Sequence, residues 1–166
     1  MVIPKRSAAM TSCLPRILAG VALASMVVPA SLAQASVAID NVQSLSFGSF
    51  VAGNSGSVTV STNGNRNAGG GVVLIPSSQG TAAQFTVSGD PNATYTIQLP
   101  GNDFVSLKGS GIDMFINNFL STPSGAEGQL GAGGSQALSV GGTLNVGSDQ
   151  AHGSYSGTFS VTVSYN

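Results

Sequence analysis

The sequence predicts an all-β sandwich of antiparallel strands. Apolar residues recur with a period of two far more often than with the 3.6-residue period of a helix. Short apolar runs are separated by clusters of Gly, Asn, Pro and Ser, including the turn sequences Asn63-Gly64 and Asp90-Pro91. Short strands at regular spacing with such turns are typical of a sandwich or barrel. We therefore expect a single β-sandwich domain over residues 36–166.

The candidate strands share an alternating or short continuous apolar pattern, and no segment has the pattern of a helix of ordinary length. In order, they cover residues 37–42, 45–51, 57–61, 72–76, 84–88, 94–99, 104–108, 112–118, 136–146 and 154–165. Within 136–146, Gly141-Gly142 is compatible either with a tight hairpin turn or with a bulge inside one long strand.

Residues 1–35 have the order of a secretory signal peptide. Three basic residues precede the apolar run 17–28, and small residues follow it. Cleavage after Ala33 and cleavage after Ala35 both fit the pattern, and we take Ser36 as the first residue of the mature chain. The apolar run is shorter than the roughly 20 residues that span a bilayer, so we predict removal of this segment rather than a membrane anchor.

The charge of the mature segment excludes nucleic-acid binding. From residue 36 onward, Arg66 and Lys108 stand against six acidic residues, a net charge of −4. Two basic residues cannot form the surface that displaces counterions from phosphates. Cys13 is the only cysteine and precedes Ser36, so the stability of the mature domain must come from burial and backbone pairing rather than from disulfides.

The sequence offers little for catalysis. The only histidine is His152, and Asp149, His152 and Ser154 lie within six positions of one another, whereas a catalytic triad gathers its members from separate segments. Asp103 and Asp113 flank a predicted hairpin, where we expect them to be solvated.

Metal binding has no better support. No Cys or His cluster exists, and the Asn-rich turn 63–67 lacks the carboxylates of a calcium loop. We therefore predict no catalytic residue, no metal and no cofactor, and a protein that is not an enzyme.

The last strand carries the clearest pattern. Residues 154–165 place every large side chain on one face and Ser or Thr on the other. The apolar face must be covered by the opposite sheet, as in an ordinary core strand, or by another chain. The candidate assembly residues at this end are Gly153, Tyr155, Phe159, Val161, Val163 and Tyr165.

This C-terminal strand, with its penultimate Tyr165 and with Gly153 ahead of it, resembles the C-terminal signature of chaperone–usher pilins. The sequence Leu-Ser-Phe-Gly-Ser-Phe at 45–50 is similar to an early strand of the spore-coat-U-like pilins. Over the whole mature chain, the sequence resembles a bacterial family of exported, glycine-rich, cysteine-free β-domains of unknown function. The blocks that carry this likeness are 45–50, 83–89 with 93–97, 117–119, 140–144 and 153–159.

The pilin resemblance implies an immunoglobulin-like sandwich that lacks one strand and exposes a groove. In such families a periplasmic chaperone lends a strand first, and the N-terminal segment of the next subunit then replaces it. The donor candidate here is the mature N-terminus, where Val37 and Ile39 alternate with polar or small residues, although the period breaks before Val42. Alternatively, residues 37–42 form the first strand of the domain itself.

We therefore expect an exported structural or adhesive subunit of a fimbria-like surface assembly built by β-strand addition. Its expected partners are copies of itself or related subunits, a periplasmic chaperone and an outer-membrane usher, without nucleic acid and without a transmembrane anchor after cleavage. It would pass through the periplasm to the cell surface or the medium. The alternative is a self-contained secreted or periplasmic β-sandwich domain that binds carbohydrate or protein.

Overall fold

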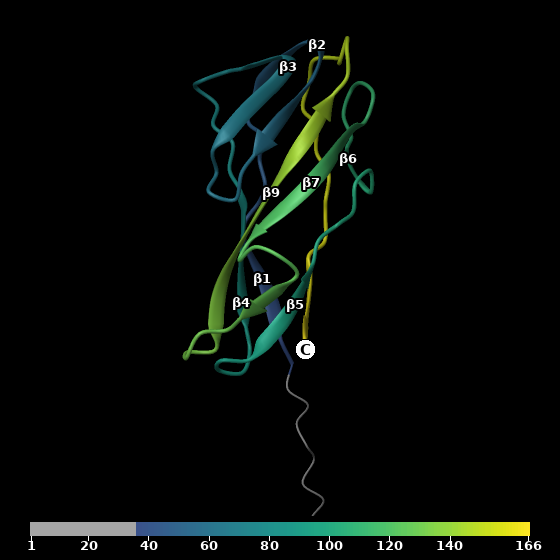
Figure 1. Cartoon of the computed structure of the whole chain (residues 1–166). Helices are drawn as coiled ribbons and strands as arrows, with labels where there is room; N and C mark the ends of the chain where they lie inside the picture. Colours follow the sequence, from purple (N-terminus) through teal and green to yellow (C-terminus); the bar gives the residue numbers. More distant parts are fainter. Residues whose placement is uncertain (1–35) are drawn as a thin grey trace, which may run out of the picture. The chain divides into compact units, whose positions relative to one another are not determined.

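The computed structural model describes residues 36–166, which form strands and connecting loops (Figure 1). The predicted signal peptide, residues 1–35, lies outside the described residues. Within the described part of the chain, no helix is long and apolar enough to cross a membrane. The strands are β1 (Ala38–Gln43), β2 (Phe50–Val60), β3 (Arg66–Leu74), β4 (Ala83–Ser88), β5 (Thr94–Gln98), β6 (Val105–Leu107), β7 (Met114–Thr122), β8 (Glu127–Gln129), β9 (Ser135–Val146) and β10 (Thr162–Tyr165).

The long strand β9 organises the larger sheet (Figure 1). Along one of its edges, β4 pairs with residues 135–140 and β2 pairs with residues 142–146. Along its other edge, β7 pairs with residues 139–144. Strand β3 extends the sheet beyond β2, β1 extends it beyond β4, and β6 extends it beyond β7.

A second sheet has the strand order β10-β5-β8. It covers the inner face of the half of β9 that pairs with β4, because residues of β4, β5, β9 and β10 share one apolar cluster. Every strand pairing in both sheets is antiparallel. The predicted all-β, sandwich-like arrangement of antiparallel strands is therefore confirmed.

Two apolar clusters fill the interior. Val58, Val60 and Leu144 belong to the first, beneath the part of β9 that pairs with β2. Tyr95 and Leu138 belong to the second, beneath the part that pairs with β4. All five side chains are almost completely excluded from solvent. Each fully buried aliphatic side chain contributes about 1.5–3 kcal/mol, so these clusters supply much of the stability of a domain without disulfides.

The glycine-rich segments are the main place where the sequence prediction falls short. The predicted strands leave gaps at residues 52–56 and 62–71, yet β2 runs through the first gap and β3 covers residues 66–71 of the second. The two backbones approach so closely that a Cβ atom at Gly53 would lie 2.8 Å from the carbonyl oxygen of Gly71. A Cβ at Gly71 would in turn lie 2.6 Å from the carbonyl oxygen of Asn54. The glycines here permit pairing rather than interrupt it.

The hairpin interpretation of Gly141-Gly142 is wrong, because both glycines lie inside β9. Gly142 pairs with Val60 of β2, and Val140 pairs with Ala83 of β4. Gly141 therefore marks the point where the neighbour on this edge changes from β4 to β2. A Cβ atom on Gly141 would collide with the carbonyl oxygen of Val60, which explains why a residue without a side chain stands there.

The predicted strand 154–165 is regular only over β10, with one isolated bridge at Ser156. Its predicted alternation is nevertheless present. Tyr155, Phe159, Val161, Val163 and Tyr165 are each half-buried, while the Ser and Thr between them are exposed. Nothing in the sequence predicts strand β8, because Glu-Gly-Gln has no apolar alternation.

The buried Tyr95 should make the fold less stable as the pH rises above 10. Its side chain is fully buried, its hydroxyl donates a 2.7 Å hydrogen bond to Oε1 of Gln136, and burial raises the pKa of Tyr95 above its ordinary value of 10.0. Above about pH 10 the unfolded chain loses this proton before the folded chain does, so the free energy of unfolding falls until the folded-state pKa is passed.

We therefore expect Tyr95→Phe to lower the free energy of unfolding at pH 7 by about 1 kcal/mol through the lost hydrogen bond. The variant should also lose less stability than the unaltered protein as the pH rises past 10. Urea unfolding followed from pH 7 upward measures both effects, with Tyr165→Phe, a change at a half-buried ring, as the matched control. Parallel pH profiles for Tyr95→Phe and the unaltered protein would contradict this assignment.

Candidate functional site

A groove of about 670 Å³ lies between the segment 44–49, which follows β1, and the segment 153–159, which precedes β10. Apolar side chains of both segments and of β2, β4, β6, β7 and β9 form its floor, and polar side chains, among them Asn41, Gln150 and His152, also line it. Phe47, Phe50, Leu107, Met114, Ile116 and Phe159 are among the lining residues. No Asp, Glu, Lys or Arg lines the groove within the described part of the chain.

The first rim of the groove, residues 44–49, is paired on one side only. Ser46 exchanges two backbone hydrogen bonds of 2.8 Å with Thr81, ahead of β4. In an extended chain, alternate residues direct their N–H and C=O groups to opposite sides, so the backbone groups of Leu45 and Phe47 face away from Thr81. Among residues 36–166, the N–H groups of Leu45 and Phe47 have no hydrogen-bond partner. This rim therefore presents unpaired donors beside the groove.

The second rim, residues 153–159, has the same one-sided pairing. Ser156 exchanges backbone hydrogen bonds of 2.8 and 2.9 Å with Lys108, at the end of β6. The backbone groups of Tyr155 and Gly157 consequently face the opposite side, towards the groove. Figure 1 shows this C-terminal segment, in yellow, running beside β6 and β7. Over residues 157–161, the backbone finds no hydrogen-bond partner in the described residues.

Arg66 at the start of β3 fixes the first rim. Its guanidinium donates hydrogen bonds to the carbonyl oxygens of Phe47 at 2.9 Å, Ser49 at 3.0 Å and Ile75 at 2.8 Å. Gly48 between them has a φ of +63°, and a Cβ atom there would collide with the guanidinium. The five donors of a planar guanidinium suit this bridging of several carbonyls, so the rim is held in place.

Tyr155 fixes the second rim. Its hydroxyl donates to the carbonyl oxygen of Ala151 and accepts from Nε2 of Gln150, both at 2.9 Å. The same Gln150 nitrogen donates to the carbonyl oxygen of Ile112 at 2.6 Å. The loop ahead of the rim is thus tied to the β6–β7 connection.

Phe159 joins the groove to the interior. Its ring packs edge-on against Phe85, with 6.3 Å between centroids, and against Phe119 at 5.3 Å. It contacts both apolar clusters and also lines the groove. The floor of the groove is therefore continuous with the core, and a chain bound there would extend that core.

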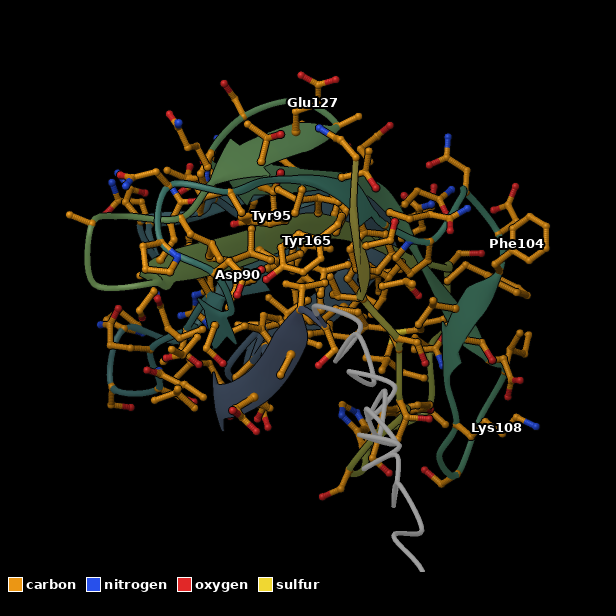
Figure 2. All side chains as sticks on the ribbon, turned by 90° about the horizontal axis from the view of Figure 1, so that it is seen from below. Asp90, Tyr95, Phe104, Lys108, Glu127 and Tyr165 are labelled. Carbon is orange, nitrogen blue, oxygen red and sulfur yellow. The ribbon has the colours of Figure 1, made fainter. Side chains whose placement is uncertain are left out.

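The structure brings together only some of the predicted assembly residues. Gly153, Tyr155 and Phe159 line the groove. Val161, Val163 and Tyr165 lie further along the chain and pack on the second cluster. Figure 2 shows Tyr165 beside Asp90, whose backbone N–H donates a 2.6 Å hydrogen bond to the tyrosine hydroxyl.

Val37 and Ile39 lie outside the groove. Ile39 pairs with Val87 in the β1–β4 ladder, and the side chains of Val37 and Ile39 are half-buried against the second cluster. In this structure residues 38–43 are the first strand of the domain itself, which was the alternative that the sequence left open.

Three residues that fix the rims, Arg66, Gln150 and Thr81, were not among the predicted site residues. For Arg66 a signal existed, since it is one of two basic residues after position 36 and its neighbours are small and uncharged. Nothing in the sequence indicates that its partners are three carbonyl oxygens contributed by other segments.

Of the residues considered for catalysis, His152 and Ser154 line the groove, but within the described residues no hydrogen bond joins them to each other or to Asp149. Asp149, His152 and Ser154 are exposed, and the His152 carbonyl accepts a hydrogen bond from Ser110. Asp103 exchanges hydrogen bonds of 2.8 and 3.0 Å with Asn117. Asp113, by contrast, accepts a 3.4 Å bond from Ser106. Among residues 36–166, no three His, Cys, Asp or Glu side chains are grouped so that they could hold a metal ion.

Residues 44–49 and 153–159, each paired through its backbone on one side, thus flank the groove of this β-sandwich. The chain belongs to a family described as a domain of unknown function, DUF4402, whose model matches residues 37–165. Searches of curated proteins and of solved structures found no significant match.

Hydrogen exchange will test the two free edges. We expect the amides of Leu45, Phe47 and Gly157 to exchange much faster than those of Ser46 and Ser156, because only the latter two donate backbone hydrogen bonds. Residue-resolved exchange by NMR measures this directly. Equal protection of neighbouring amides in both segments would mean that the groove edges are paired.

Arg66→Met will test the fixation of the first rim. We expect a loss of about 2 kcal/mol in the free energy of unfolding, because three carbonyl oxygens lose a charged donor. The matched variant Arg66→Lys keeps the charge but cannot bridge three carbonyls, so its stability should fall between those of Arg66→Met and the unaltered protein. Urea unfolding measures the loss, and the Ser49 amide should exchange faster in both variants. Unchanged stability in Arg66→Met would contradict the bridging role.

Proposed function

We propose that this chain is an exported structural or adhesive subunit of a surface assembly, and that a β-strand from another polypeptide fills its groove. The observation that carries this proposal is the unpaired backbone on both sides of the groove, the N–H groups of Leu45 and Phe47 on one side and Tyr155 and Gly157 on the other. Unpaired strand edges beside apolar surface readily pair with another chain.

The energetics favour a strand over a small charged ligand. An added strand would form hydrogen bonds with both rims at once and would bury the floor at about 25 cal/mol per Å² of apolar surface. A charged ligand would have to give up its hydration in a groove that offers no Asp, Glu, Lys or Arg as a partner.

The resemblance to chaperone–usher pilins supports the same proposal. On this proposal the signal peptide directs the chain to the periplasm, a chaperone occupies the groove in transit, and an usher passes the subunit to the surface. The chain has no catalytic role and needs no cofactor.

A self-contained secreted binding domain is the second candidate. It is favoured by β1, which pairs with β4 within the same chain, and by the two apolar clusters that the domain closes without a partner. In that case the groove would serve a soluble ligand, and the protein would be found as a monomer in the periplasm or medium.

One experiment distinguishes the assembly subunit from the self-contained binding domain. Material sheared from cells that produce the protein is run on a denaturing gel with and without heating. Strand-added assemblies dissociate very slowly, so we expect this chain in high-mass species that become monomer only on boiling. A single monomer band in both lanes would overturn the proposal.

Ala52→Asp gives the matched test of the groove. Ala52 lines the groove and is half-buried, so a carboxylate there should remove the heat-sensitive species while the domain still folds. The control Val51→Asp adds the same charge one residue away on the exposed outer face, and it should leave the assembly intact. Thermal unfolding of both variants checks the fold. Assembly of Ala52→Asp at the level of the control would contradict the role of the groove.

A further inference from the structure

We infer that the groove accepts its strand from a different kind of polypeptide and that this chain lends none of its own. This inference rests on the proposed function, since it concerns the occupant of the same groove. Three observations on the N-terminal segment carry it: its pairing, its side-chain pattern and its length.

The N-terminal segment already pairs with a strand of its own domain. Strand β1 pairs with β4 from Ala38 to Gln43, and Ile39 lies opposite Val87. Val37 and Ile39 cover the second apolar cluster of their own domain. Lending this segment would break the β1–β4 ladder and expose a cluster that includes the fully buried Val87. The segment is therefore an integral strand rather than a free extension.

The pattern of the segment does not suit the groove. A strand in the groove directs alternate side chains onto the apolar floor. In one register these would be Val37, Ile39 and Asn41, and in the other Ala38, Asp40 and Val42. The second register would bury the Asp40 carboxylate in a groove that has no Lys or Arg, and the first offers only two apolar side chains, Val37 and Ile39, to the floor.

The length ahead of β1 is also too short. With cleavage after Ala33 or Ala35, at most residues 34–37 precede β1, which is about 13 Å of extended chain at roughly 3.3 Å per residue. The second rim, residues 153–159, is about 23 Å long by the same measure. A free segment of this size cannot pair along the whole rim.

The chemistry of the groove defines the occupant. It is an extended segment of another polypeptide, with aliphatic side chains at three or four alternate positions and no charge among those that point inward. The side chains between them face solvent and are free to be polar. A chain that takes such a strand and lends none stands at one end of an assembly.

The first experiment uses the full chain, produced alone with its own signal segment and recovered after export. We expect monomer by light scattering and a single band on the unheated gel. A ladder of this chain alone would overturn the inference and leave the proposed function standing.

The second experiment adds a synthetic peptide, acetyl-Val-Thr-Val-Thr-Val-Thr-Val followed by two solubilising lysines. We expect it to bind the monomer and raise its melting temperature. The same peptide with Asp at the central Val should bind at least about tenfold more weakly, because the carboxylate would be buried unpaired. A version N-methylated at alternate residues, whose amides can no longer pair with a rim, should not bind.

A peptide with the sequence of residues 36–43 completes the test, and we expect it to bind as weakly as the Asp-containing peptide. If the 36–43 peptide binds as tightly as the alternating peptide, the inference is overturned, but the proposed function is not. Failure of the alternating peptide to bind, or equal binding of its N-methylated form, would overturn strand addition itself and with it the proposed function. Thermal unfolding of the Ala52→Asp protein shows whether the alternating peptide binds in the groove. If it does, the peptide should not raise the melting temperature of this variant.

Discussion

Backbone pairing along β9 is the constraint on which the rest of the structure depends. Along one edge, β9 pairs first with β4 and then with β2. Along the other edge, it pairs with β7 across Gly141, where the neighbour on the first edge changes. Its inward side chains are divided between the two apolar clusters, Leu144 in the first and Leu138 and Val140 in the second. Residues 36–166 contain no cysteine, so the two halves of the core are connected by packing and pairing, through the continuous β9 and through Leu45, Phe119 and Phe159, which contact both clusters.

Glycine is the residue that makes this arrangement possible. At Gly141 and at the β2–β3 pairing near Gly71, neighbouring backbones approach too closely for any side chain. The glycines, which look like strand breaks in the sequence, therefore allow long strands to change partners and to pair tightly. Substitution by alanine at these positions forces backbones apart rather than merely filling space.

These close approaches also explain what the sequence could and could not predict. Alternation is a local property, so the all-β class and most strands were predictable, including the half-buried apolar face of residues 154–165. The continuity of β9 through Gly141 and of β2 through Gly56 depends on the backbone of another strand, which no local pattern records. The groove is not local either, since residues 44–49 and 153–159 meet only in the fold. Arg66 could be noticed as a rare cation, but its three carbonyl partners come from two loops, Phe47 and Ser49 from one and Ile75 from the other.

The two rims differ in how far they are ordered before anything binds. Arg66 holds three carbonyl oxygens around the first rim, whereas residues 157–161 on the second side have no hydrogen-bond partner in the described part of the chain. A chain that enters the groove consequently meets one edge held by hydrogen bonds and, beyond Ser156 on the other edge, a stretch of backbone that loses more conformational freedom on contact. The entropic penalty of complex formation is thus concentrated on the C-terminal side. Substitutions there would alter affinity through the conformational freedom that binding removes, even where they leave the bound interface itself unchanged.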